Sequence, residues 1–422
     1  MLNFTCRCIQ CGRAIPLDES PGRPCATCGP IDGTTAVEYD LASARLDPAH
    51  PFDDRLPGLF RYAAILPVDP PGERLPVRVG DTPLYEAPRL ASRLGIAKVL
   101  VKDDGRNPSA SSKDRASAMA VAHALRLGRP VIAAASTGNA ASSLALLAAA
   151  AGLRAVLFVP VTAPRPKLAQ MLLAGAAVVR VHGTYDQAFD LCAAACDRFG
   201  WYSRNTATNP LLAEGKKTAA LEIAEGCRWD PPDVVAVGVG DGCVAAALHK
   251  GFRELHALGL IRRLPRLIGV QAAGCAPLAH AFRTRGRPAP VLEPRTYADS
   301  IAVGVPRDQK KVLTAVAESG GEIVAVPDDL IREAQRLLAR ESGVFAEPAG
   351  AAGLAGLLHL SRARRLPEQT RAAVLVTGHA LKDTEAALSA APEAPMDIPA
   401  SEDALDSVAA RVESAAFPGE TR

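Results

Sequence analysis

A lysine stands in an unusual setting in the stretch NPSASSKDRAS, residues 107 to 117. Small hydroxyl and methyl side chains precede Lys113, and an aspartate and an arginine follow it directly. A lysine held in a partly buried loop can lose its proton and form an imine with a carbonyl compound. Because most lysines are solvated surface charges, this stretch alone leaves both interpretations open.

A glycine-rich turn in VVAVGVGDGCVAAALHKGF, residues 234 to 252, offers a second chemical site. An apolar run leads into Gly238, Gly240 and Gly242, and an alanine-rich helix is predicted to follow. Glycines let the backbone approach a ligand closely, and the N–H groups at a helix start attract an anion. A dinucleotide site would need an acid after the next strand, where this sequence has Gln271. The pattern therefore favours the phosphate of a smaller cofactor over NAD or FAD, with a ligand-free turn as the alternative.

Two polar loops that follow predicted strands strengthen the imine interpretation. The loop ASTGNAAS, residues 135 to 142, supplies hydroxyls and the carboxamide of Asn139. The stretch LVTGHALKD, residues 375 to 383, ends another strand with the hydroxyl of Thr377. Ligands of α/β folds bind at the carboxyl ends of strands, where both loops are expected to lie.

Four cysteines near the start form two CxxC pairs, CIQCG with Cys8 and Cys11 and CATCG with Cys25 and Cys28. Each pair can direct two thiolates at one tetrahedral Zn²⁺, and the glycine after each pair permits a tight turn. Because all four ligands would be protein thiols, the pattern predicts a closed structural zinc site. Four reduced cysteines without a metal are the alternative, and Cys6 is expected to be a spare thiol.

The elements that must position these groups alternate along the chain. Helical patterns lie between several apolar runs that are typical of strands, and these runs cover residues 129–135, 154–160, 176–183, 233–240, 266–272, 321–327 and 372–379. Residues 139–152 and 327–343 show two of the helical patterns, the second with acids at its start and a closing glycine. This alternation predicts an α/β fold with parallel sheets.

Composition narrows the class of protein. A chain of 422 residues exceeds what one hydrophobic core usually covers, so at least two domains are expected. The net charge of +3 is spread along the chain, which argues against nucleic-acid or anionic-lipid partners. The most apolar run, residues 142–160, is interrupted by Gly152 and Arg154 and indicates a buried helix and strand, not a membrane span. We see no signal peptide and no disulfide scaffold, and we expect a cytoplasmic protein.

Several blocks, in this order, resemble the pyridoxal-phosphate enzymes of the tryptophan synthase β fold (fold type II), most closely the threonine synthase family. The resemblance runs from about Cys8 to about Asp383. The blocks are CIQCG, GDTPLYEAPRLASRLG (80–95), VKDDGRNPSASSKDR (101–115), ASTGNAAS, LAEGKKTAALEIAE (212–225), LIGVQAAGCAPL (267–278), GVFAEPAGAAGLAGL (343–357) and VTGHALKD. The resemblance implies pyridoxal 5'-phosphate as the cofactor.

The resemblance also implies roles for individual residues. Lys113 matches the lysine that is covalently joined to the cofactor and later acts as the base at the substrate's Cα. Asn139 matches the carboxamide at the ring hydroxyl, and Thr377 matches the hydroxyl beside the ring nitrogen. Ser136 and Thr137 occupy the loop expected to hold the substrate carboxylate. The phosphate loop corresponds to Gly240, Asp241, Gly242, Cys243 and Val244.

The sequence departs from the threonine synthase pattern where that family binds the phosphate of its substrate. The family motif NSINPFRLEGQKT corresponds here to TATNPLLAEGKKT, residues 206 to 218. Thr206, Ala207 and Leu212 stand where the family has Asn, Ser and Arg, so we expect weakened recognition of O-phosphohomoserine. Three cations could compensate for the missing arginine, namely Arg106, Arg204 and Lys216.

We therefore expect a two-domain α/β enzyme with an N-terminal zinc-ribbon-like segment. The expected parts are a ribbon (1–35), a linker or wrapping segment (36–80), a large domain (81–113 and 226–390), a small domain (114–225) and a flexible tail (391–422), in which DALDSVAARVESA could form a helix.

The predicted function is a lyase of amino-acid metabolism that acts by β- or γ-elimination or replacement, in a homodimer. The alternatives are a threonine or serine ammonia-lyase and a non-catalytic binding protein that keeps the fold. Glu347 is expected to start a helix, with a contact to the cofactor ring as the alternative. Cys243 is expected to be a small buried loop residue, with a nucleophilic role as its alternative.

Overall fold

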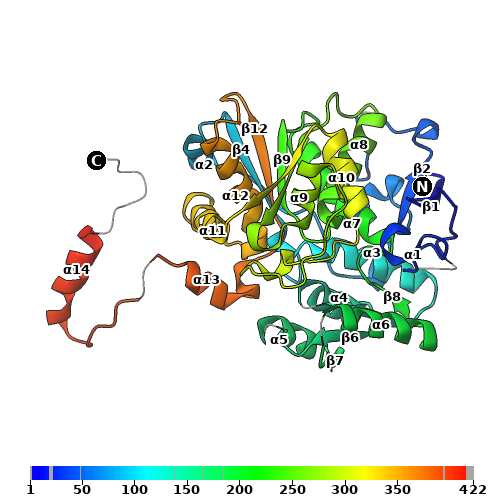
Figure 1. Ribbon diagram of the computed structural model, residues 1–422, viewed down its shortest axis with the longest axis horizontal. Helices are drawn as coiled ribbons and strands as arrows, with labels where there is room; N and C mark the ends of the chain where they lie inside the picture. Colours follow the sequence, from blue (N-terminus) through cyan, green and yellow to red (C-terminus); the bar gives the residue numbers. More distant parts are fainter. Residues whose placement is uncertain are drawn as a thin grey trace.

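The computed structural model describes residues 2–18, 22–47, 49–136, 138–163, 165–183, 185–392 and 395–414. Two sheets with helices packed around them make up the body of the molecule, and a two-stranded ribbon lies against one side (Figure 1). The predicted α/β class is therefore confirmed.

The larger sheet has six strands, and its adjacent strands run parallel to each other except at one edge. Its order is β11 (Glu322–Val326), β10 (Arg266–Ala272), β9 (Val234–Gly238), β12 (Arg371–Val376), β4 (Lys98–Asp103) and the antiparallel β3 (Leu84–Glu86). The central strands are runs of Val, Leu, Ile and Ala because helices cover both faces, as parallel sheets require.

The smaller sheet has four parallel strands. Its order is β7 (Ala177–Val181), β6 (Arg154–Pro160), β5 (Val131–Ala135) and β8 (Tyr202–Ser203). The apolar runs expected at 154–160 and 266–272 form β6 and β10 with the expected bounds. Sequence periodicity did not indicate β4, although it pairs with two neighbours in the larger sheet, because it leads directly into the polar stretch before Lys113.

The helices connect the strands of both sheets. Their bounds are α1 (Gly29–Asp32), α2 (Pro88–Leu94), α3 (Lys113–Arg126), α4 (Asn139–Ala150), α5 (Arg165–Leu173), α6 (Tyr185–Phe199), α7 (Leu211–Gly226), α8 (Cys243–Ala257), α9 (Pro277–Thr284), α10 (Gln309–Glu318), α11 (Asp328–Ser342), α12 (Pro348–Arg362), α13 (Thr384–Ala390) and α14 (Leu405–Ser414). Short 3₁₀ turns lie at 41–43, 58–65, 72–74, 104–106, 273–275, 299–301, 380–382 and 402–404. Figure 1 shows α14 away from the body of the molecule.

The N-terminal ribbon pairs β1 (Phe4–Cys8) with β2 (Thr35–Tyr39) in antiparallel register, so that Cys8 lies opposite Thr35. The segment that follows the ribbon packs against the body of the molecule. Leu59, Tyr62 and Ile65 of the 58–65 turn are fully buried against the body.

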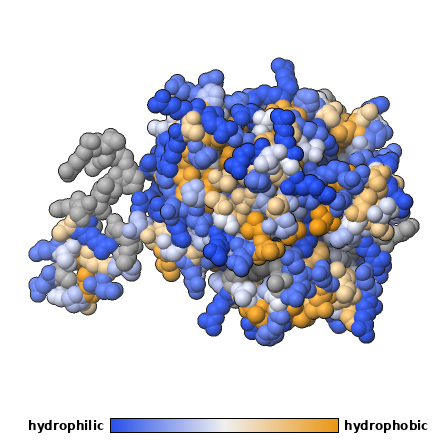
Figure 2. All heavy atoms as spheres, viewed as in Figure 1, coloured by the Kyte–Doolittle hydropathy of each residue, from blue (hydrophilic) through white to orange (hydrophobic). Residues whose placement is uncertain are grey.

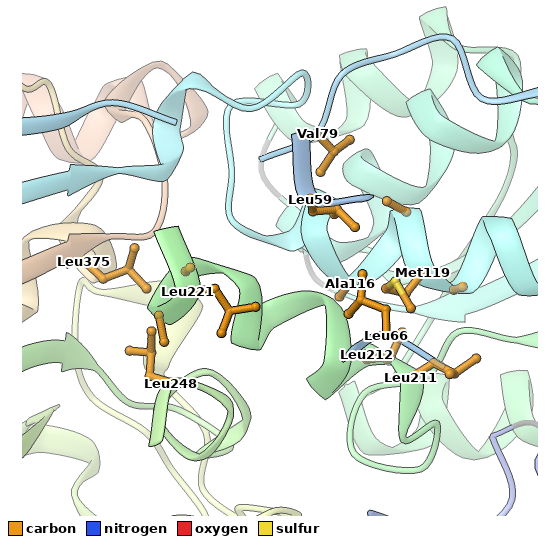
Figure 3. Close-up of a cluster of buried hydrophobic side chains, with 14 of the residues drawn as sticks. Leu59, Leu66, Val79, Ala116, Met119, Leu211, Leu212, Leu221, Leu248 and Leu375 are labelled. Carbon is orange, nitrogen blue, oxygen red and sulfur yellow. The ribbon is translucent and has the colours of Figure 1, made fainter. Parts of the chain in front are cut away.

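A single apolar cluster extends from the smaller sheet to the larger one. Helix α7 runs through it: Leu211 and Leu212 pack near Leu66 and Met119, while Leu221 lies toward Leu248 and Leu375 (Figure 3). Because the same helix contributes to both ends of the cluster, the two sheets share one continuous core.

A buried ion network lies beside this core. Arg115 of α3 donates to Asp104 at 2.8 Å and to Glu222 of α7 at 2.6 Å, and Lys102 of β4 donates to Glu222 at 2.6 Å. Burial opposes the charged carboxylate, but Arg115 and Lys102 outweigh it and lower the pKa of Glu222 to about 2. The network ties α3 and α7 to the larger sheet.

The face of the molecule seen in Figure 2 is mixed in character. Hydrophilic side chains cover much of it, and the hydrophobic ones gather in smaller, separate patches. Among the described residues, no helix combines the length and the apolar character needed to cross a bilayer.

We predict that Arg115→Met lowers the free energy of unfolding by about 3–5 kcal/mol, because it leaves Asp104 and Glu222 buried without their main cation. Urea unfolding monitored by circular dichroism measures the change. The control is Arg295→Met, which removes an ion pair whose two side chains are about four-fifths exposed and should change little. Equal effects of the two substitutions would show that the network is not structurally important.

Candidate active site

One cavity brings the predicted site residues together. It has a volume of about 460 Å³ and lies at the carboxyl ends of strands from both sheets. Its lining includes Lys113, Ser136, Asn139, Thr377 and the whole turn 240–244. Thr137, the remaining predicted residue, lies outside the described residues. Groups that are far apart in the sequence therefore face one space large enough for a small ligand.

Lys113 is the first residue of α3, and backbone contacts bring it next to the loop of Thr377. The Ser112 N–H donates to the Thr377 carbonyl at 2.9 Å, and the His379 N–H donates to the Ala110 carbonyl at 3.1 Å. Ser111 and Gly378 form an isolated antiparallel bridge between these contacts. This short ladder explains how the lysine and Thr377 come to line the same cavity.

The two charged residues after Lys113 do not neutralise its amine. Asp114 accepts hydrogen bonds from the backbone N–H and hydroxyl of Ser109, both at 2.6 Å, and Arg115 belongs to the buried ion network. Burial, reinforced by the positive charge of Lys216, lowers the pKa of Lys113 to about 8. The amine can therefore act as a nucleophile or a base near neutral pH.

The glycine turn links β9 to α8 and presents donors to the cavity. Gly242 has a left-handed backbone with φ of +94°, which favours glycine, and a Cβ on Gly240 would come within 2.9 Å of the Val303 side chain. Among the described residues, no oxygen accepts a hydrogen bond from the N–H groups of residues 240–244. Free donors at the start of a fifteen-residue helix are suited to a phosphate.

The carboxylate of Asp241 turns toward the segment before α10. It accepts a hydrogen bond from the Arg307 N–H at 3.1 Å, and the Asp241 carbonyl accepts one from the Asp308 N–H at 3.2 Å. Burial raises the pKa of this carboxyl group. These contacts hold the turn against the segment before α10.

Asn139, the first residue of α4, is oriented by Glu347. Its Nδ2 donates to both carboxylate oxygens of Glu347, at 2.7 and 3.0 Å. Its Oδ1 is buried and has no partner among the described residues. A buried acceptor without a donor is costly, so this oxygen is positioned to accept a hydrogen bond from a ligand.

Glu347 therefore has a role that the sequence indicated only in part. It immediately precedes α12, as expected for a residue that starts a helix, and it also lines the cavity. The cavity wall formed by residues 291–307 was missed altogether, because this stretch is irregular apart from one 3₁₀ turn and has no periodic signal. Ser300 in this wall accepts a long 3.4 Å hydrogen bond from Asn139.

Cys243 is buried at the start of α8, and burial raises the pKa of its thiol well above the ordinary value. A thiol with a raised pKa is a poor nucleophile. The geometry thus favours the small buried loop residue over the nucleophile.

The four N-terminal cysteines also converge. The sulfur atoms of Cys8, Cys11, Cys25 and Cys28 all lie within 4.8 Å of one another. The glycine after each pair, Gly12 or Gly29, has a left-handed φ of +72° or +77°. All ten cysteines of the chain are free thiols. Four clustered thiols match the donor set of a structural zinc site.

The main cavity suits a ligand with a carbonyl carbon at one end and a phosphate at the other. The amine of Lys113 can join the carbonyl carbon, the turn 240–244 can hold the phosphate, and Asn139 and Thr377 can orient polar atoms between them. The lysine and the phosphate donors are supplied by different helices, α3 and α8, which both begin at this cavity.

Comparisons with known proteins agree with this geometry. The family described as "Pyridoxal-phosphate dependent enzyme" matches residues 76–378. The threonine synthase of Methanosarcina acetivorans is 38% identical over 404 residues, which cover 94% of this chain and 97% of that protein. The threonine synthase of Methanocaldococcus jannaschii is 37% identical over 390 residues, which cover 92% of this chain and 95% of that protein.

Solved structures show the same fold. A T.th. threonine deaminase superposes with a TM-score of 0.59 at 26% identity, covering 71% of this chain and 92% of that one. A maize serine racemase superposes with a TM-score of 0.62 at 17% identity, covering 79% of this chain and 92% of that one.

We predict that reductive methylation of Lys113 in the ligand-free protein rises with pH around a midpoint of about 8, because its amine is protonated below that pH and neutral above it. Mass spectrometry of the Lys113 peptide measures the modified fraction. In Lys216→Gln the midpoint should move upward toward the ordinary value of 10.5, since a neighbouring positive charge has been removed. A wild-type midpoint near 10.5 would mean that the amine is solvated.

Proposed function

This chain belongs to the pyridoxal-phosphate dependent enzymes, as a threonine synthase relative that acts by elimination or replacement at a carbon–oxygen bond, and we propose that Lys113 is its catalytic residue. The observation that carries the proposal is the amine of Lys113, with its lowered pKa, in one cavity with the free N–H groups of residues 240–244. When bound, the cofactor supplies an electron sink for negative charge at the substrate's Cα.

In this proposal each side chain holds or moves a defined group. Lys113 would hold the cofactor through its amine, and its Nζ, when free, would take the proton from the substrate's Cα. The turn 240–244 holds the phosphate through backbone N–H groups, with Gly240, Asp241, Gly242, Cys243 and Val244 as its members. Asn139 orients the cofactor ring through its unpaired Oδ1, and Glu347 fixes the amide.

Thr377 would supply a neutral hydroxyl to the ring nitrogen of the cofactor. A hydroxyl cannot stabilise a positive charge there as a carboxylate could, so the site favours prompt loss of a leaving group over transamination. Ser136, whose hydroxyl accepts from the Gly138 N–H at 3.0 Å, and Thr137 are proposed to hold the substrate carboxylate. The loop at the start of α4 thus serves both the ring and the substrate.

The substrate is proposed to differ from O-phosphohomoserine. Ala207 and Leu212 are buried, and neither lines the cavity. Leu212 lies in the apolar cluster beside Leu66 and Met119 (Figure 3), so an arginine's role has been replaced by core packing. A threonine or serine ammonia-lyase is the second candidate, supported by the 26% identity with the threonine deaminase structure.

The ribbon is proposed to hold a structural zinc ion through Cys8, Cys11, Cys25 and Cys28. The position of the ribbon would let the metal stabilise the neighbouring helix α10. Lys310 of α10 donates to the Ile9 carbonyl and to the Gln10 side chain, both at 2.8 Å, and these two residues lie inside the first CxxC pair. The same end of α10 follows Arg307 and Asp308, whose N–H groups hold Asp241. The ribbon therefore braces the phosphate turn.

A cytoplasmic homodimer completes the proposal. Dimers are what the family resemblance implies, and ten free thiols fit a reducing compartment.

We predict that the purified protein absorbs near the band of a lysine-bound pyridoxal cofactor, and that borohydride fixes the cofactor on the Lys113 peptide. Lys113→Ala should lose the fixed cofactor, and its activity should fall by about a thousandfold or more because base and attachment point are both removed. Titration with O-phosphohomoserine, threonine and serine then tests the substrate. Threonine formation from phosphohomoserine would overturn the proposed substrate, and release of a keto acid would select the ammonia-lyase. A pure protein without the absorbance band would favour a non-catalytic role.

We predict one zinc ion per chain by atomic spectroscopy, because four thiolates complete a tetrahedral site. Cys11→Ser should lose the metal, melt at a lower temperature and retain the cofactor less well, since the brace through Lys310 is loosened. The control is Cys227→Ser, which changes a free thiol outside the cluster. A metal-free wild type with normal stability would support the alternative of four reduced cysteines.

A further inference from the structure

A second lysine in the cavity has no counter-charge that contacts it. The Lys216 residue of α7 is only 3% exposed, and it lines the cavity with Lys113 and the glycine turn. Among the described residues, no acceptor lies within hydrogen-bond or ion-pair distance of its amine. An ammonium with no protein partner that opens onto a cavity can take its counter-charge from a bound anion.

The adjacent lysine shows what a purely structural buried lysine looks like in the same helix. Lys217 Nζ donates to Glu214 and Glu254 at 2.6 Å each and to the Ile65 carbonyl at 2.7 Å. Other buried lysines are paired in a similar way: Lys102 with Glu222, and Lys167 with Asp299. Lys216 differs from these three lysines because no acidic side chain among the described residues pairs with it. It is also the one lysine of these four that lines the cavity.

Two anions could meet Lys216, namely the cofactor phosphate and an acidic group on the substrate. The phosphate already has the free N–H groups of the turn 240–244. Lys216 lies on α7 and lines the same cavity as Thr206, and it is close enough to Lys113 to lower the pKa of that amine. A substrate whose Cα proton is taken by Lys113 would occupy this cavity, where an acidic group on it can meet Lys216.

The charge balance favours an anion with one negative charge. Lys216 supplies one ammonium to this lining. Arg307, another cation on this lining, is already bonded to Asp186. A dianion would leave negative charge uncompensated in a buried cavity.

On the proposed function, we propose that Lys216 is the specificity-determining residue of this enzyme, and that it binds a terminal carboxylate on the side chain or leaving group of the amino-acid substrate. The phosphate-binding arginine expected from the family pattern is replaced by the buried Leu212, and Lys216 brings an ammonium to the cavity from a different position. The substrate class is thus an amino acid with a carboxylate-ended side chain.

The test uses the holoenzyme and three unreactive probes of similar length: norvaline, 2-aminoadipate and 2-amino-5-phosphonopentanoate. Their dissociation constants come from the change in cofactor absorbance. We expect wild type to bind 2-aminoadipate about tenfold or more tightly than norvaline, as one charge-assisted contact provides, and at least as tightly as the phosphonate. Lys216→Gln should reduce the preference to about threefold or less. Lys98→Gln, which removes a surface charge paired with Glu86, should keep it.

Thermal melting of the ligand-free protein provides an independent readout. Lys216→Met should leave the melting temperature unchanged or raise it, because an unpaired buried charge is removed. Lys217→Met, one residue along the same helix, should lower it, because Glu214 and Glu254 lose their partner. A fall of equal size in both variants would contradict a binding role for Lys216.

Three other results would overturn the inference. The first is a wild type that binds 2-aminoadipate no better than norvaline, and the second is a wild type that binds the phosphonate more tightly than the carboxylate. The third is a Lys216→Gln variant that loses the cofactor and keeps the preference, which would assign the lysine to the cofactor phosphate. Failure of the proposed function itself is distinct, because a wild-type protein without cofactor absorbance would fail before any probe is added.

Discussion

The desolvation of one amine is the constraint on which the rest of the structure depends. Lys113 begins α3 in a cavity between two sheets, and burial lowers its pKa to about 8. Such a group is stable only if its surroundings are held rigidly, since any opening would let water restore its charge. The ladder to residues 377–379 and the buried contacts of Arg115 supply that rigidity on either side of the lysine.

Helix α7 contributes both to the buried core and to the lining of the cavity. It carries Leu212 and Leu221 in the shared apolar core, Glu222 closes the buried ion network, and Lys216 reaches the cavity. A change of side chain on this helix can therefore alter the core packing and the cavity lining together.

The N-terminal ribbon is part of the same mechanical system. Lys310 joins the first cysteine pair to α10, and the residues before α10 hold Asp241 in the phosphate turn. Order in the ribbon is thus transmitted to the cofactor site through hydrogen bonds between rigid elements. A metal held by the four cysteines, as proposed, would stabilise this distant turn without touching any ligand there.

The sequence by itself determined the α/β class, the family and the bounds of β6 and β10, because strand periodicity and short polar motifs are local signals. It also predicted Lys113, Asn139 and Thr377 as site residues, and the structure places all three on one cavity. The sequence did not indicate strand β4 or the cavity wall of residues 291–307, because hydrophobic residues in a motif-rich or irregular stretch show no clear periodicity. Only the tertiary structure decided that Glu347 orients Asn139 and that Lys216, unlike Lys217, has no partner among the described residues. Which charges are neutralised depends on contacts between residues that are far apart in the chain, and no local pattern encodes those contacts.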